Sequence, residues 1–167
     1  MWHDASSDRY IKLTKPNCFG FTVGAEWFID DAKDEAELTP ALRGATPLEY
    51  LERLRLHNAV FGDRIELLGI IDKRQALHVV TSQPTIRGEA TPDLEIAWFM
   101  SQLGFHRLPR ISIGRLGALS FLRDSDGLAA FDCHPANFLA HEGDVFPIDV
   151  ILVPASEELR AALPDHP

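Results

Sequence analysis

Apolar residues recur at strand-like and helix-like spacings along the chain, and these spacings predict the order of its elements. Apolar and polar residues alternate over 10–15, which predicts a strand. A capping box starts at Thr46, has proline at the first helical position and precedes apolar residues at helical spacing. We therefore expect a helix that runs to about Phe61 and stops at the next residue, a glycine. Two β-branched, apolar runs at 65–71 and 76–82, with polar residues between them, then predict a hairpin.

The second half of the chain reads as a helix followed by short strands. We expect, in chain order, an extended stretch over 84–91, a helix over 92–103, a strand over 128–131, a hairpin that turns at 142–144 and a short helix over 156–163. The apolar positions of the helix over 92–103 are Leu94, Ala97, Trp98 and Leu103. The short segment that follows leaves Trp98 and Phe99 with little to cover them. We therefore expect either a homo-oligomer or docking on a larger protein partner.

Composition bounds the class of protein. The 167 residues suit one domain with a single core. The formal net charge of −9 disfavours general binding to nucleic acid or to an anionic bilayer. Residues 26–37 carry six acidic side chains, and we interpret them as a solvated loop or helix face. Positive charge gathers instead over 96–123, which contains arginines and no acidic residue.

The sequence shows neither the long apolar run of a membrane protein nor the many cysteines of a disulfide-bonded protein. No apolar run approaches the ~20 residues of a membrane-spanning helix, and the first residues show no secretion signal. A soluble, cytoplasmic protein with no membrane partner is expected. Its two cysteines, Cys18 and Cys133, are too few for a disulfide framework, so reduced thiols are expected. We interpret Cys133 as a small buried thiol rather than a nucleophile.

The residues that can carry chemistry lie between 131 and 149. Asp132 precedes Asn137 by five positions, and a short hairpin then returns the chain to Asp149. An aspartate and an asparagine on one loop, with a second aspartate beside them, suit phosphoryl transfer from a nucleotide. One carboxylate orients or deprotonates the acceptor hydroxyl, while the asparagine and the second carboxylate hold Mg²⁺, which prefers oxygen ligands. Two plainer roles remain open: Asp132 and Asn137 can cap a turn, and Asp132 with His134 and Asp149 can hold a transition metal.

The motifs around these residues resemble a known family. Asp-Cys-His-Pro-Ala-Asn-Phe-Leu from Asp132, followed by Glu-Gly-Asp-Val-Phe-Pro-Ile-Asp up to Asp149, is similar to the catalytic segment of small-molecule kinases of the aminoglycoside phosphotransferase kind. The closer resemblance is to the kinase-like domain of large polyvalent proteins of phages and other mobile elements, and it spans about 9–153. It also takes in Tyr-Ile-Lys-Leu-Thr-Lys-Pro from Tyr10, Thr-Pro-Leu-Glu-Tyr-Leu-Glu-Arg-Leu from Thr46, Leu-His-Asn from Leu56 and Val-Thr-Ser-Gln-Pro from Val80.

The resemblance implies a fold. That fold is a truncated, kinase-like α+β fold of one domain. Its N-terminal part over 1–82 would hold an antiparallel sheet and one helix, and its short C-terminal part over 83–167 would hold the catalytic loop.

The resemblance also implies site residues. Asp132 would be the catalytic-loop aspartate, with Asn137 and Asp149 as metal ligands. Lys12 would contact phosphate, although an exposed strand lysine is the plainer reading. Its helix partner would be Glu52, because Glu49 is used by the capping box. The hinge that receives the adenine edge would be formed by Thr81, Ser82 and Gln83.

Three departures from kinases leave two functions open. Ala130 stands where kinases have histidine, no glycine-rich loop lies near Lys12, and few residues follow Asp149. The leading expectation is Mg²⁺-dependent transfer of a phosphoryl group from ATP or another nucleotide to a hydroxyl of a protein or a small molecule. The alternative is a catalytically inactive, pseudokinase-like binding or interaction module.

Overall fold

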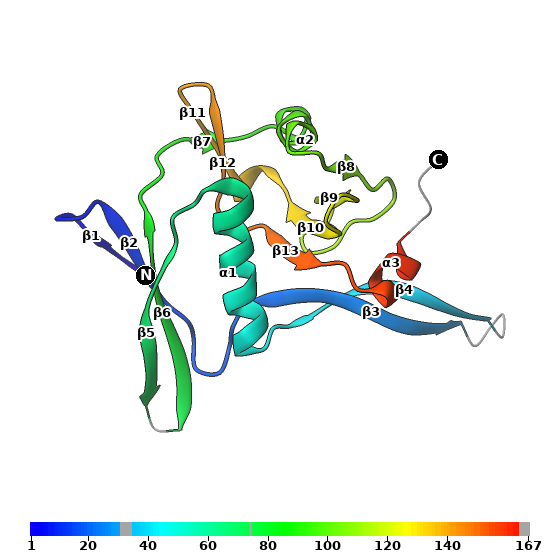
Figure 1. Cartoon of the computed structure of the whole chain (residues 1–167), viewed down its shortest axis with the longest axis horizontal. Coiled ribbons are helices and arrows are strands. Elements are labelled where there is room, and N and C mark those ends of the chain that lie inside the picture. Colours follow the sequence, from blue (N-terminus) through cyan, green and yellow to red (C-terminus); the bar gives the residue numbers. More distant parts are fainter. Residues whose placement is uncertain (31–34, 74, 164–167) are drawn as a thin grey trace.

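The N-terminal sheet has four antiparallel strands in the order β1-β2-β6-β5 (Figure 1). The computed structural model describes residues 1–30, 35–73 and 75–163. The strands of this sheet are β1 (Trp2–Asp4), β2 (Arg9–Leu13), β5 (Glu66–Lys73) and β6 (Ala76–Pro84). The expected first strand and hairpin are thus confirmed. In the ladder between β2 and β6, Lys12 lies opposite Thr81.

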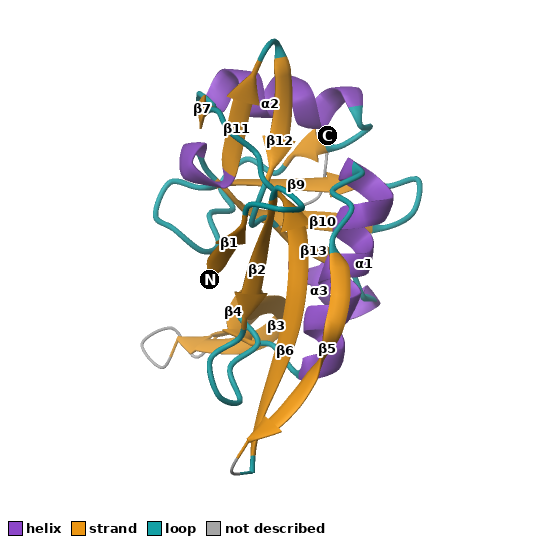
Figure 2. Cartoon of the chain, turned by 90° about the vertical axis from the view of Figure 1, so that its left-hand side faces the viewer, coloured by secondary structure: helices purple, strands orange, loops and turns teal. Residues whose placement is uncertain are grey.

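Helix α1 (Pro47–Phe61) begins and ends where the capping signals predict. The Thr46 side chain accepts a hydrogen bond from the Glu49 backbone N–H, and the Glu49 carboxylate accepts one from the Thr46 N–H. At the other end, Gly62 has a left-handed φ of 70° and donates its N–H to Asn58. Figures 1 and 2 show α1 standing between the N-terminal sheet and the C-terminal strands.

The acidic segment forms a long β-hairpin, so the expectation of a loop or helix face is wrong, whereas its acids Glu26, Glu35 and Glu37 are exposed, as expected for a solvated segment. Its strands are β3 (Phe21–Asp30) and β4 (Glu35–Gly44), which pair in continuous antiparallel register. Asp31, Lys33 and Asp34, part of the expected loop or helix face, lie outside the described residues. The hairpin is held by packing at its base, where Val23 is buried against residues of the C-terminal part.

The C-terminal part contains two further sheets, with strand orders β13-β10-β9-β8 and β12-β11-β7. Their strands are β7 (Glu89–Ala90), β8 (His106–Arg107), β9 (Leu119–Arg123), β10 (Leu128–Cys133), β11 (Phe138–His141), β12 (Asp144–Pro147) and β13 (Ile151–Pro154). The helical elements are α2 (Asp93–Gln102), the 3-10 turn η1 (Pro135–Asn137) and α3 (Glu157–Ala162). The expected helices, strand and hairpin of this half are confirmed.

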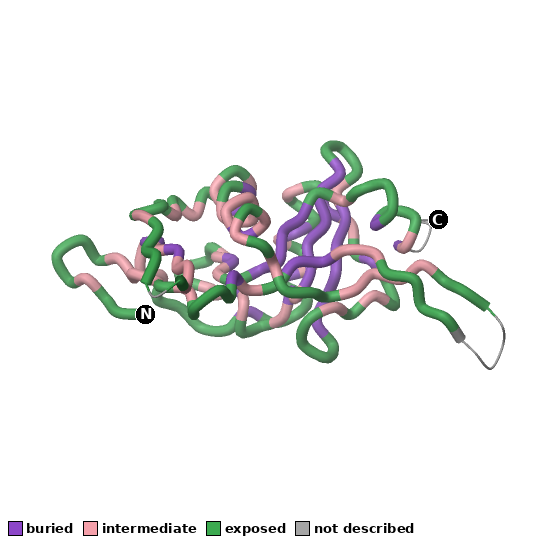
Figure 3. Tube along the Cα trace, turned by 90° about the horizontal axis from the view of Figure 1, so that it is seen from below, coloured by how far each residue is buried: buried purple, intermediate pink, exposed green. Residues whose placement is uncertain are grey.

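The core is concentrated in the C-terminal strands, as Figure 3 shows. Ile96 and Met100 of α2 are fully buried there, whereas Leu94 and Trp98 on its other face are 85% and 64% exposed. An apolar surface is therefore present on α2, and the oligomer or partner that it suggests stays a prediction. Phe99 is partly buried against this core.

The hairpin β3–β4 links the two parts of the chain. By sequence it belongs to the N-terminal part over 1–82, but it packs on β13 and α3 of the C-terminal part. Both cysteines are free, Cys18 exposed and Cys133 buried, as expected for reduced thiols. Among the described residues, no helix is long and apolar enough to span a membrane.

Candidate active site

Asp132 lies at an irregularity of strand β10, where the regular pairing with β9 is interrupted. The pairing of β10 with β9 is interrupted between Ala130 and Cys133, and Asp132 has a φ of 56°. A positive φ is uncommon for any residue but glycine, and aspartate tolerates it better than most. The Asp132 N–H donates to the Ile113 carbonyl instead of to a neighbouring strand. Asp132 therefore lies near the end of β10, just before the loop over 134–137 that leaves the sheet.

The Asp132 carboxylate is fixed by a second loop. Its Oδ1 accepts a hydrogen bond of 2.7 Å from the Arg115 N–H, and His134 Nε2 lies 3.6 Å from the same oxygen. Gly114 makes this approach possible: a Cβ at that position would lie 2.5 Å from the Asp132 Cγ. The side chain keeps 23% of its surface exposed, so it remains within reach of solvent and substrate.

Asn137 joins Asp132 to Asp149. Its Nδ2 donates to the Asp132 carbonyl at 2.9 Å, to Asp132 Oδ2 at 3.3 Å and to the Asp149 carbonyl at 3.3 Å. The Asn137 carbonyl also accepts from the Ile148 N–H, which closes the base of the hairpin β11–β12. The turn-capping role is thus present, and the same contacts bring the two aspartates to one place.

Lys12 and Asp149 line one small cavity of about 140 Å³. The predicted hinge residues Thr81 and Gln83 also line it, whereas Ser82 accepts a hydrogen bond from Arg9 Nε. Lys12 is half-buried, and burial lowers the pKa of its ammonium while the Asp149 carboxylate opposes that shift. Lys12 therefore points inward from the sheet and is more than a solubilising surface residue.

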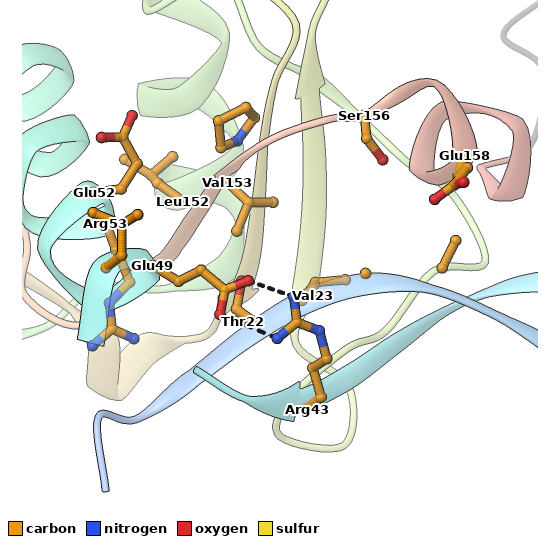
Figure 4. Close-up of a pocket in the computed structure, with 14 residues that line it drawn as sticks. Thr22, Val23, Arg43, Glu49, Glu52, Arg53, Leu152, Val153, Ser156 and Glu158 are labelled. Carbon is orange, nitrogen blue, oxygen red and sulfur yellow. Dashed lines mark hydrogen bonds and ion pairs between the residues drawn. The ribbon is translucent and has the colours of Figure 1, made fainter. Parts of the chain in front are cut away.

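Glu52 lies on another face of α1. Its carboxylate binds the Arg55 guanidinium through contacts of 2.7 and 3.0 Å. It lines a groove of about 650 Å³ between α1, the hairpin β3–β4 and β13 (Figure 4), and Arg53 lines both this groove and the cavity of Lys12. The structure thus does not bring Glu52 together with Lys12.

The face of α1 toward Lys12 carries residues that the sequence reasoning did not single out. Tyr50, Arg53, Leu54 and His57 recur at helical spacing and line the cavity with Lys12. Arg53 Nη2 lies 3.9 Å from Asp149 Oδ1. The sequence signal for this face was the spacing of these four residues after the predicted N-cap at Thr46, because positions three and four apart lie on one side of a helix.

His57 ties α1 to the segment that carries Asp149. The buried ring lies between two acceptors, with Nδ1 2.7 Å from Asp63 Oδ2 and Nε2 2.7 Å from the Val150 carbonyl. Val150 directly follows Asp149, so this bridge fixes the backbone there relative to α1. Its sequence signal was the Leu-His-Asn motif from Leu56.

The donor set suits a hard cation that is shared with phosphates. Asn137 uses its Nδ2 for the contacts above, and among the described residues its Oδ1 accepts no hydrogen bond. The Asp149 side chain is 67% exposed. An amide oxygen and a carboxylate beside an open cavity fit Mg²⁺, which keeps several waters and binds phosphate oxygens. Within the part of the chain that the structure describes, no group of three or more His, Cys, Asp or Glu is placed for a metal, so the transition-metal alternative gains no support.

Comparison with known proteins gives one match. A family model described as serine/threonine/tyrosine kinase found in polyvalent proteins matches residues 31–153. That range contains Asp132, Asn137 and Asp149 and leaves out the strand of Lys12. No curated protein and no solved structure matches the chain significantly.

Proposed function

Because the chain belongs to this family of kinases found in polyvalent proteins, we propose that it transfers a phosphoryl group from ATP or another nucleotide to a hydroxyl group. The family description points to a serine, threonine or tyrosine hydroxyl of a protein. A hydroxyl of a small molecule is the second acceptor class.

Each residue of the site has a defined task in this reaction. Asp132 accepts or orients the proton of the acceptor hydroxyl, and the Arg115 N–H holds its carboxylate for that purpose. Lys12 contacts the phosphates from β2. His57 and Asn137 position the Asp149 segment through its backbone carbonyls.

Asn137 and Asp149 would hold Mg²⁺. When bound, the ion supplies positive charge that neutralises the phosphates and orients the transferred group.

One observation carries the proposal: the Asn137 amide donates to both Asp132 and Asp149, while Asp149 shares a cavity with Lys12. A turn cap alone requires neither the return of Asp149 nor a partly buried lysine across the cavity. Phosphoryl transfer depends on positioning and charge, and these four residues supply both.

A second candidate function, a pseudokinase-like binding module, rests on the size of the cavity. Its volume of about 140 Å³ lies below the ~300 Å³ at which ligand pockets usually begin. The cavity thus holds phosphate-sized groups rather than a whole nucleotide unless the surrounding side chains move. A module that binds without transfer would keep the same loop.

Two alanine variants distinguish these functions. Asp132→Ala should keep nucleotide binding and lose transfer by a factor on the order of 10² or more, because a general base acts mainly in the transition state. Asp149→Ala should lose Mg²⁺-dependent nucleotide binding first. Asp144→Ala, an exposed acid of the neighbouring strand β12, is the matched control and should change neither.

Binding is measured as a thermal shift with ATP and Mg²⁺, since ligand at ~100 times its Kd adds ~2.7 kcal/mol to stability. Transfer is measured with radiolabelled ATP on the chain itself and on peptides with Ser, Thr or Tyr. Binding without transfer in the parent protein would favour the module. No shift at millimolar nucleotide would contradict nucleotide binding altogether.

A further inference from the structure

The side of α1 that faces Lys12 presents a cation where kinases place a glutamate. In kinases, the phosphate-binding lysine pairs with a glutamate of the following helix. Here the cavity-facing positions of α1 hold Tyr50, Arg53, Leu54 and His57, and none is acidic. The nearby acids of the helix are engaged elsewhere, Glu49 with Arg43 and Glu52 with Arg55.

The cations that line this cavity outnumber the carboxylates that line it. The charged groups among its described lining residues are Lys12, Arg53 and Asp149. The Asp63 carboxylate also attracts Lys12, but it lies outside the lining and contacts His57. Among the lining groups, two cations therefore face the Asp149 carboxylate. That carboxylate is 67% exposed, whereas the Arg53 side chain is only 12% exposed. An excess of partly buried positive charge favours an anion in the cavity.

The Arg53 guanidinium has donors to spare. Its Nη1 donates to the Phe21 carbonyl at a long 3.4 Å, and its Nη2 lies 3.9 Å from Asp149 Oδ1. A guanidinium carries five N–H donors, so most of them are unused by the described residues. Figure 4 shows the group set apart from the paired Arg43 and Glu49.

Gly20 explains how the guanidinium fits beside the chain. The residue has a φ of 76°, and a Cβ there would lie 3.2 Å from Arg53 Nη2. The loop between β2 and β3 thus passes close to the Arg53 guanidinium, and the missing Cβ of Gly20 leaves room for it.

We propose that Arg53 is a second phosphate-binding residue, which together with Lys12 binds the nucleotide phosphates in place of a glycine-rich loop. This inference rests on the proposed function for the identity of the anion. A guanidinium suits the task because its planar fork binds two phosphate oxygens at once. Side-chain cations from β2 and α1 then supply the attraction that backbone N–H groups of a glycine-rich loop supply in other kinases.

The test compares three variants of the full chain by isothermal titration calorimetry with ATP and with inorganic tripolyphosphate. Arg53→Gln should weaken both ligands by on the order of tenfold to a hundredfold, the loss expected for hydrogen bonds to a charged group. Arg53→Lys should fall between Arg53→Gln and the parent protein, because lysine keeps the charge but loses the fork. Arg55→Gln, on the exposed face of the same helix, is the matched control and should bind like the parent protein.

The outcomes separate this inference from the proposed function. If the parent protein binds ATP and Arg53→Gln binds it equally well or more tightly, the inference is overturned and the proposed function stands. If the parent protein binds tripolyphosphate but not ATP, and Arg53→Gln weakens that binding, the anion site stands and the nucleotide function fails. Binding of neither ligand refutes both. Circular dichroism checks folding, and should Arg53→Gln not fold, unchanged affinity in Arg53→Lys overturns the inference.

Discussion

Replacing Gly114 with alanine tests whether the loop over 113–115 holds the Asp132 carboxylate in place. Gly114 has a φ of 95°, and an added Cβ would lie 2.5 Å from the Asp132 Cγ and 2.7 Å from its Cβ. Real Cβ atoms do not approach other atoms so closely. The Asp132 Cβ is bonded directly to the backbone, so a change of side-chain rotamer cannot move it away. Either Asp132 or the loop must therefore move, and the hydrogen bond from the Arg115 N–H is lost.

The size of the effect follows from two contributions. A left-handed backbone costs an alanine about 1–2 kcal/mol. The lost hydrogen bond to a charged group adds about 1.5–3 kcal/mol. Gly143→Ala isolates the first contribution, because Gly143 has a φ of 92° and a Cβ there would meet nothing within 4 Å. Gly114→Ala should thus be the less stable variant by about 1.5–3 kcal/mol.

Urea unfolding of both variants measures the difference in the free energy of unfolding. Phosphoryl transfer should fall by on the order of 10²-fold in Gly114→Ala, because a misplacement of about 1 Å costs that much. Gly143→Ala should transfer at the parental rate. Equal unfolding free energies for the two variants, with parental transfer in Gly114→Ala, would refute the idea that this loop positions Asp132.

Three further predictions concern groups outside the loop. Burial raises the pKa of the Cys133 thiol well above its ordinary value, so iodoacetamide at pH 8 should modify exposed Cys18 and leave Cys133 unmodified, as read by mass spectrometry. Hydrogen bonds from Arg43 and from the Thr46 backbone N–H lower the pKa of Glu49 to about 2 from an ordinary 4.5. Its stabilising contribution should therefore be complete above pH 4.5 and be lost as the pH falls toward 2, so the stability gap between parent and Glu49→Gln should narrow in urea unfolding at pH 3 compared with pH 6. Ile96→Ala should cost about 2–5 kcal/mol because the side chain is fully buried, whereas Leu94→Ala on the exposed face of α2 should change stability by less than ~0.5 kcal/mol in thermal unfolding.

The elements that the sequence predicted well are those fixed by local interactions. Helix α1 follows from its capping box and its terminal glycine, and the hairpin β11–β12 follows from a turn between two apolar runs. The return of Asp149 to Asp132 and Asn137 follows from that hairpin, so the sequence predicts it, whereas the contacts from Arg115 and His57 that fix the two aspartates come from distant segments.

The hairpin β3–β4 was missed because its structure depends on distant contacts. Trp27, Phe28 and Ile29 are consecutive, apolar and exposed, so the alternation that marks a half-buried strand is absent. The buried anchor Val23 packs on residues of β13 and α3 that lie far along the chain. Composition alone therefore indicated the exposure of the acidic side chains but favoured a loop or a helix over a strand.

Glu52 was expected beside Lys12, but the sequence does not determine how α1 is rotated about its axis, and the observed rotation places Glu52 away from the cavity. Apolar residues of this helix pack on both sides, Leu51 and Leu54 toward the N-terminal sheet and Leu56 and Val60 toward the C-terminal core. No single apolar stripe then fixes which face meets the cavity. A step of one residue turns a helix by about 100°, which is enough to exchange Glu52 for Arg53.

The docking of β3–β4 on the last elements of the chain has a consequence for synthesis on the ribosome. Roughly a hundred residues separate this hairpin from its partners in β13 and α3, so at about 5–20 residues per second it waits on the order of 5–20 s for them. During that time Val23, which is buried in the folded protein, lacks the residues that bury it and remains accessible to other chains. Early folding is therefore confined to local units such as α1 and the hairpin β5–β6. The interval before β13 and α3 emerge is when a nascent chain of this protein most needs a chaperone.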